Sequence, residues 1–88
     1  MKDLPSNKQK KDMQTHIENG FKIMKDYLPV TYLEKVKAKL PAGFASDDTI
    51  RNVRRNIQKP ENQIEIFLAL VEVAKENKAA IEKLAEIV

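Results

Sequence analysis

The 88-residue sequence has no cysteine, a single histidine, two glycines and no apolar run long enough to cross a membrane. The missing cysteines exclude disulfides, thiolate metal sites and a cysteine nucleophile, and one histidine cannot build a zinc site alone. The N-terminal segment MKDLPSNKQKK has no apolar core and therefore does not resemble a secretory signal. We expect a cytoplasmic protein with no cofactor and no membrane association.

The scarcity of glycine and of β-branched residues argues against a sheet, and the apolar residues recur at helical spacing. We predict an all-α fold, a compact domain of four or five helices that contains a helix-turn-helix. Residues 1–10 are polar and lysine-rich, and they are interpreted as a flexible basic tail; an arm that contacts phosphates is the alternative. Residues 11–88 form the single helical domain.

The first predicted helix is marked by an apolar stripe with steps of three and four residues. Its members are Met13, Ile17, Phe21, Met24 and Leu28. Pro29 ends it, because the residue before a proline avoids the helical region. Asn19-Gly20 leaves a break open, because the pair is also a hairpin-turn signal.

Three further helices are predicted from capping residues. Thr31 and Glu34 have capping-box spacing and open a helix over residues 32–40. Ser46 caps a helix whose buried residues are Ile50, Val53 and Ile57. Asn62 and Glu65 repeat the capping-box spacing at the start of a long helix over residues 62–88.

No arrangement of residues indicates catalysis. Asp47 and Asp48 are neighbours, and neighbours on a helix point about 100° apart, so they cannot easily flank one bond. Acids in a first helical turn are explained by the helix dipole instead. His16 has no paired serine or cysteine nearby. We therefore expect neither an enzyme nor a small-molecule substrate.

Positive charge is concentrated in the first part of the chain. Residues 1–59 hold 13 Lys and Arg against 7 Asp and Glu, whereas residues 60–88 hold 3 against 6. The only arginines of the chain are Arg51, Arg54 and Arg55. Helical geometry points Arg55 almost straight away from the core, with Arg54 on a flank. A solvated basic face and a nucleic-acid contact surface both have this pattern.

The segment SDDTIRNVRRN (46–56) resembles the second, recognition helix of lambda-repressor-like and lactose-repressor-like proteins. Matches to the run Ser-x-x-Thr-Val-x-x-Val are Ser46, Thr49, Ile50 and Val53, and Asn56 falls where Asn or Gly is common. Leu28, Pro29 and Tyr32, with the later segment NQIEIFLALVEVAKENK, are similar to small helix-turn-helix proteins of Bacteroidetes genomes and mobile elements. The resemblance covers about residues 28–78.

The resemblance implies a bacterial transcription regulator or mobile-element accessory factor that binds double-stranded DNA sequence-specifically. Its helix-turn-helix would span about residues 31–57. The chain departs from the pattern in its turn, LPAGFAS, which is longer than usual, and in Asp47 and Asp48, which stand where base-reading residues usually lie. These acids can accept a hydrogen bond from the N4 amino group of cytosine. Alternatively, Asp47 can pair with Arg51 at i, i+4, or Asp48 can pair with it at i, i+3.

The predicted DNA-binding residues fall into two groups. The base-reading side chains are Arg51, Asn52 and Arg55, and the phosphate contacts are Thr49, Arg54 and Lys59. The long C-terminal helix is apolar on more sides than one packing face requires, which predicts a homodimer. The alternative function is a helical protein-interaction or dimerisation module that binds no nucleic acid.

Overall fold

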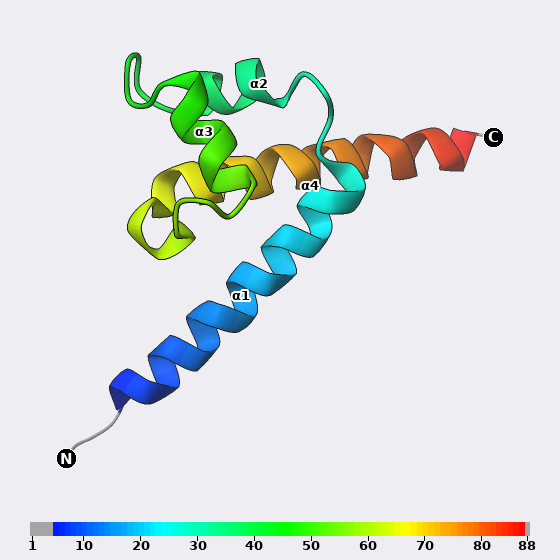
Figure 1. Cartoon of the computed structure of the whole chain (residues 1–88). Helices are drawn as coiled ribbons and strands as arrows, with labels where there is room; N and C mark the ends of the chain where they lie inside the picture. Colours follow the sequence, from blue (N-terminus) through cyan, green and yellow to red (C-terminus); the bar gives the residue numbers. More distant parts are fainter. Residues whose placement is uncertain (1–4, 88) are drawn as a thin grey trace.

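The computed structural model describes residues 5–87, with side chains from Met13 onward, as four α-helices (Figure 1). They are α1 (Pro5–Tyr27), α2 (Tyr32–Lys39), α3 (Asp47–Arg54) and α4 (Ile64–Ile87), with a 3₁₀ turn, η1 (Pro60–Asn62), before α4. The described residues contain no strand, and the predicted all-α fold is confirmed.

α4 is the central element of the fold. It contacts α1, α2, α3 and η1, and α2 and α3 also contact each other. The buried apolar side chains are Met24, Val36, Ile50, Val53, Ile66, Phe67, Ala69, Leu70, Val73 and Ala74. More than half of them belong to α4, because a helix apolar on several sides can bury several neighbours at once.

α1 begins at Pro5, so residues 5–10 of the segment predicted as a flexible tail are helical in the structure. Proline suits the first helical position, where its missing N–H would have no partner, and lysine and glutamine are good helix formers. Residues 1–4 of the predicted tail lie outside the described residues. The helix then continues without interruption to Tyr27, and Pro29 follows its end as predicted.

Gly20 marks the place where α1 crosses α4. It is buried, and a Cβ added to it would lie 2.6 Å from Cζ of Phe67 and 2.9 Å from Cγ2 of Val71. The neighbouring Phe21 ring meets the Phe67 ring edge-on, with centroids 5.2 Å apart. A break or hairpin at Asn19-Gly20 is therefore wrong: the glycine allows a close helix crossing.

α2 begins at Tyr32 as predicted but lacks the predicted capping box. Thr31 makes no side-chain cap hydrogen bond. Instead, the Tyr32 N–H donates to the Pro29 carbonyl at 3.1 Å, so a backbone turn provides the partner. The connection to α3 passes through Gly43, whose φ of 74° favours glycine.

α3 ends at Arg54, before the predicted Ile57. Asn56 adopts a left-handed φ of 62°. Its N–H donates to the Val53 carbonyl at 3.0 Å, and the Ile57 N–H donates to the Asn52 carbonyl at 2.8 Å. This pair of bonds is a Schellman motif, which ends the helix and turns the chain away. Ile57 is consequently 66% exposed, and its predicted burial is wrong.

α4 begins at Ile64 and not at Asn62, because residues 60–62 form η1. Pro60 is buried in this turn, and the Phe67 N–H donates to the Gln63 carbonyl at 2.9 Å. The second predicted capping box is therefore displaced by the 3₁₀ turn, which contains Asn62 itself.

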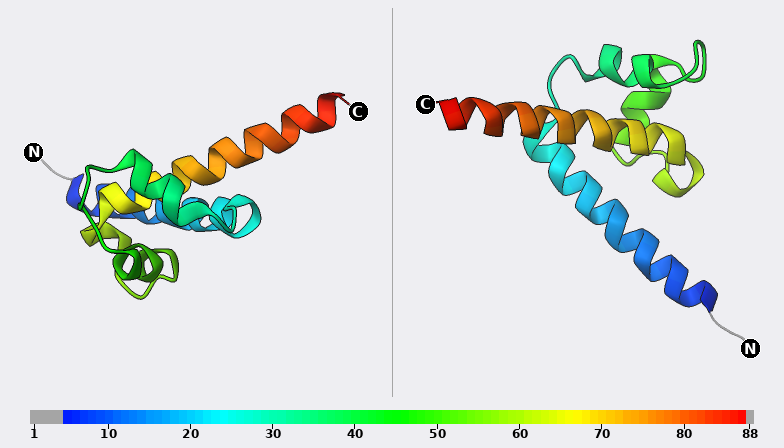
Figure 2. Two further views of the ribbon diagram at one scale, coloured as in Figure 1. Left: turned by 90° about the horizontal axis from the view of Figure 1, so that it is seen from above. Right: turned by 180° about the vertical axis from the view of Figure 1, so that it is seen from behind.

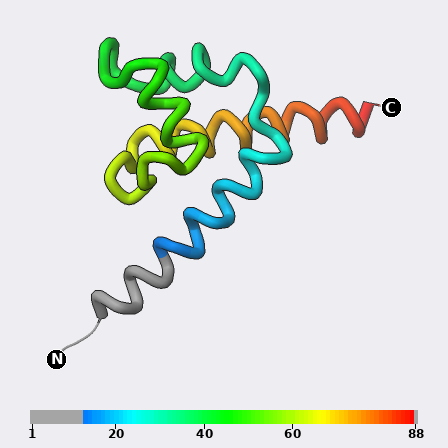
Figure 3. The backbone as a smooth tube through the Cα atoms, in the orientation of Figure 1, coloured from blue at the N-terminus to red at the C-terminus, as the bar shows by residue number. Residues whose placement is uncertain are grey.

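Two helical segments extend away from the packed centre. The N-terminal part of α1 and the C-terminal part of α4 project in different directions in both orientations of Figure 2. The tube in Figure 3 follows the chain from α2 through a turn into α3 and then into α4. Both α2 and α3 contact α4. Among the described helices, none has an apolar stretch sufficient for a membrane span.

Candidate nucleic-acid interface

One face of α3 is fixed to the body of the protein and the other is exposed. Ile50 and Val53 are 0% exposed and hold the helix against α2 and α4. Because successive helical residues are about 100° apart, Asp48 and Arg51 fall on the outer side. The Asp48 side chain is 88% exposed and that of Arg51 is 42% exposed.

The start of α3 is held by the predicted Ser46 cap, which is confirmed. The Ser46 hydroxyl accepts from the Thr49 N–H at 3.2 Å, and the two hydroxyl oxygens of Ser46 and Thr49 lie 2.9 Å apart in a hydrogen bond. The Thr49 hydroxyl, a predicted phosphate contact, is therefore engaged in the cap.

Asp47 connects α3 to α2. Its Oδ1 forms an ion pair with Nζ of Lys37. The hydrogen bond from Lys37 is the main cause that lowers the pKa of Asp47 below its ordinary 3.8, and the charge of Arg51 adds to it. The carboxylate that opens α3 is thus neutralised from the preceding helix.

Asp48 pairs within α3. Its Oδ1 accepts from Nη1 of Arg51 at 3.2 Å, the i, i+3 arrangement. Of the two pairs predicted for Arg51, the ion pair with Asp48 forms, and Asp47 is bound by Lys37. Both acids at the start of α3 therefore have a cationic partner.

Arg54 and Arg55 lie at the C-terminal end of α3. The Arg54 guanidinium lies 5.4 Å from the centroid of the Tyr32 ring on α2, within cation–π range. Arg55 follows the last helical residue, and its N–H donates to the Arg51 carbonyl at 2.9 Å. Both side chains are exposed.

Asn52 lies within α3, between Arg51 and Arg54, whereas Lys59 lies beyond the end of the helix. Asn52 is half-buried, and its carbonyl closes the Schellman motif. Lys59 lines a groove of about 700 Å³ between α1 and the loop before η1. The same groove is lined by Glu18 and Glu61, so its charge is mixed and does not favour a polyanion.

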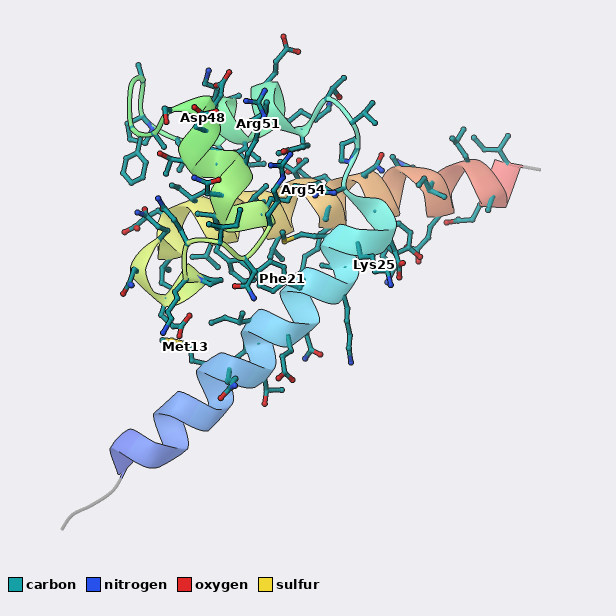
Figure 4. The ribbon with its side chains drawn as sticks, in the orientation of Figure 1. Met13, Phe21, Lys25, Asp48, Arg51 and Arg54 are labelled. Carbon is teal, nitrogen blue, oxygen red and sulfur yellow. The ribbon has the colours of Figure 1, made fainter. Side chains whose placement is uncertain are left out.

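Lys25 of α1 joins the arginines, although sequence reasoning did not select it. It lines a small cleft of about 220 Å³ together with Arg54, Phe21 and Met24. In Figure 4, Arg51, Arg54 and Lys25 follow one another in a row from α3 to α1. No sequence signal pairs residue 25 with residue 54, because only the tertiary packing brings α1 to the end of α3.

Two acidic residues of α4, Glu72 and Glu76, lie beside Lys39 of α2. Lys39 of α2 is bonded to Oε2 of Glu76 at 2.7 Å and lies 3.7 Å from Oε1 of Glu72. The hydrogen bond with Glu76 is the main cause that raises the pKa of Lys39 above its ordinary 10.5. Part of the negative charge of the C-terminal third is thereby compensated by α2.

Comparisons of the chain with known protein families, with curated proteins and with solved structures found no significant match. The site therefore has to be interpreted from its own residues.

Proposed function

We propose that the chain binds double-stranded DNA sequence-specifically, with α2 and α3 as a helix-turn-helix and α3 in the major groove. One observation carries the proposal: α3 is fixed by two fully buried residues, while Arg51 is partly exposed on its outer side and Arg54 and Arg55 are exposed at its end. A firmly held helix with exposed arginines suits both phosphate contact and readout of base edges. A role as a small transcription regulator or mobile-element accessory factor follows from this proposal.

The predicted base-reading side chains differ in how freely they can contact a base. Arg55 has the strongest support, because it is exposed and has no ion-pair partner among the described side chains. Arg51 is held by Asp48, which orients its guanidinium before contact. Asn52 is half-buried, so its amide has less reach toward a base.

The predicted phosphate contacts differ in the same way. Arg54 is exposed and oriented by Tyr32, which supports the role. Thr49 has its hydroxyl in the Ser46 cap, and Lys59 shares its groove with acidic side chains. We therefore assign Arg54 as the main phosphate contact on this side of α3.

Arg55→Ala and Arg54→Ala test the proposal on a selected site and on a scrambled duplex at two salt concentrations. If Arg55 reads a base, its loss costs about 1–3 kcal/mol on the selected site and relaxes preference there. If Arg54 contacts phosphate, its loss weakens binding on both duplexes and lowers the salt slope by about one unit. Unchanged affinity of both folded variants would contradict DNA binding through α3.

The exposed part of α4 supports a second candidate function, self-association. One stripe of residues recurs every three or four positions along the helix, and all of its members except Asn77 are apolar: Phe67, Leu70, Ala74, Asn77, Ile81 and Leu84. The first half of this stripe is buried by the other helices. Beyond Asn77, whose Nδ2 donates to the Tyr27 carbonyl at the end of α1 (2.6 Å), Ile81, Leu84 and Ile87 are 46%, 63% and 80% exposed.

We propose a second copy of the chain as the partner, with the two projecting ends of α4 antiparallel. A parallel pair would place the two packed bodies side by side. There the same face of α4 is already covered by the other helices of each copy, so it is not available for contact. An antiparallel pair puts the bodies at opposite ends and brings Ile81 of each copy opposite Leu84 of the other. The segment beyond Asn77 carries equal numbers of Lys and Glu, so copies do not repel. Two copies would also present two α3 helices to two half-sites.

Leu84→Glu tests this assembly, with Leu68→Glu as its matched control. Leu68 is 54% exposed on the same helix but lies about 160° around it from Leu84. By sedimentation equilibrium we expect Leu84→Glu to be monomeric and Leu68→Glu to remain dimeric. A wild-type mass near 10.1 kDa at micromolar concentration would refute the dimer.

A further inference from the structure

The cleft between α1 and the end of α3 combines an apolar floor with a cationic rim. Met24, 3% exposed, and Phe21 form the apolar part. Lys25 and Arg54 supply the charged groups, and none of the described residues that line the cleft is acidic. With a volume of about 220 Å³ it is small, so a compact anion fits it better than a peptide or a base-sized ligand.

Both cations are available to such an anion. Neither Lys25 nor Arg54 forms an ion pair with any of the described side chains. Arg54 is also held in place, because its guanidinium lies against the Tyr32 ring. An arginine held by an aromatic face loses less conformational freedom when it binds, and its planar fork matches phosphate oxygens. Lys25 comes from a different helix and approaches as a compact positive charge.

The cleft also continues the charged surface of α3. Arg51, Arg54 and Lys25 follow one another from α3 to α1 (Figure 4), so the cleft lies at the C-terminal end of the proposed recognition helix. A DNA strand that borders α3 would pass this end of the helix. Backbone contacts at that point would set the register of α3 in the groove without reading sequence.

We infer that Lys25 and Arg54 together hold one phosphate group of the DNA backbone in this cleft. The inference rests on the proposed DNA binding and adds a contact from α1 to it. One phosphate shared by two helices would fix the angle between α1 and α3 on DNA.

The experiment measures binding to a mixed-sequence duplex between 50 and 200 mM salt, because phosphate contacts do not depend on sequence. The variants are Lys25→Ala, Arg54→Ala and the double variant. Lys22→Ala, an exposed lysine on the same helix that does not line the cleft, is the matched control. Circular dichroism and thermal unfolding confirm that each variant is folded.

If the two cations hold one phosphate, the double variant lowers the salt slope by about 0.9. Over the fourfold rise in salt from 50 to 200 mM, the affinity deficit of the double variant relative to wild type then shrinks by about 3.5-fold. Its loss of affinity is smaller than the product of the two single losses, because the contacts are coupled. A slope change near two units with multiplicative losses would mean two separate phosphates and overturn the inference.

A second arm distinguishes DNA from a free phosphate ion. Inorganic phosphate is titrated against sodium chloride of equal ionic strength while the backbone amide shifts of α1 and α3 are followed by NMR. We expect no saturable shift below about 10 mM phosphate, because one phosphate with two contacts binds weakly without its neighbours. Saturation at the cleft, with DNA affinity unchanged in Lys25→Ala, would assign the cleft to a free anion and overturn the DNA contact.

The outcomes separate the two proposals. If wild type binds no DNA, DNA binding and the backbone contact both fail. If wild type binds DNA but Lys25→Ala behaves like Lys22→Ala, only the shared phosphate contact fails, and binding through α3 stands.

Discussion

Replacing Gly20 with alanine should destabilise the protein, although helix propensity alone predicts the opposite. In a solvated helix interior, alanine is more favourable than glycine by about 0.8–1.0 kcal/mol. At Gly20 the new Cβ would lie 2.6 Å from Cζ and 2.9 Å from Cε2 of Phe67. The Phe67 ring is 4% exposed and packs against Phe21, so it has little room to move.

An ordinary carbon–carbon contact of about 3.5–4.0 Å requires the ring or the helix to shift by roughly 1 Å. Overpacking of this kind typically costs about 1–3 kcal/mol. After subtraction of the propensity gain, we expect a net loss of about 1 kcal/mol. For a domain of this size that corresponds to a decrease in Tm of about 4–8 °C.

Thermal and urea unfolding of Gly20→Ala measure this loss, and two variants isolate its cause. Asn19→Ala, at the exposed neighbouring position, should stabilise by a few tenths of a kcal/mol, because only propensity changes there. In a Phe67→Leu background, which removes the ring but leaves Cγ2 of Val71 2.9 Å from the new Cβ, Gly20→Ala should lose the larger part of its penalty. A gain of about 1 kcal/mol for Gly20→Ala in the wild-type background would refute the close-crossing argument.

The remaining predictions concern the ends of helices and one ion pair. Ser46→Ala should cost about 0.5–2 kcal/mol of unfolding free energy through loss of its cap, whereas Thr31→Ala, which removes no cap bond, should cost clearly less in the same urea titration. Asn56→Val should cost about 1–2 kcal/mol or more because of its left-handed backbone, and Asn56→Gly should not; equal losses would contradict this. The raised pKa of Lys39, caused mainly by Glu76, stabilises the fold fully below pH 10.5 and less as pH rises through the folded-state pKa. The Tm difference between wild type and Lys39→Gln should therefore shrink above pH 10.5, and a constant difference would argue against the ion pair.

The helical periodicity of the sequence predicted the fold class and the approximate helices, because burial of an amphipathic face is encoded at local spacing. The helices α1, α2 and α4 lie close to their predicted ranges, and Ser46 caps α3 because its hydroxyl needs only a partner three residues away. The capping boxes predicted at Thr31 and Asn62 do not form, although their spacing is also local. The same spacing also fits a turn, and the backbone geometry before each helix decides which one forms.

The sequence also predicted only part of the candidate site. The sequence alone grouped the three arginines at one short helix, although Arg55 follows its last residue, and it offered Asp48 as one of two partners for Arg51. It could not place Ile57, because its periodicity argument assumed a helix that in fact ends at the Schellman motif around Asn56.

By itself, then, the sequence determined where helices form and which side of each is apolar, because these depend on residues three or four positions apart. Tertiary structure decided the roles of Gly20, Asp47 and Lys25. Their partners, Phe67, Lys37 and Arg54, are 47, 10 and 29 positions away in the chain. Such pairings arise only when helices pack, because packing brings together side chains whose separation in sequence has no fixed spacing.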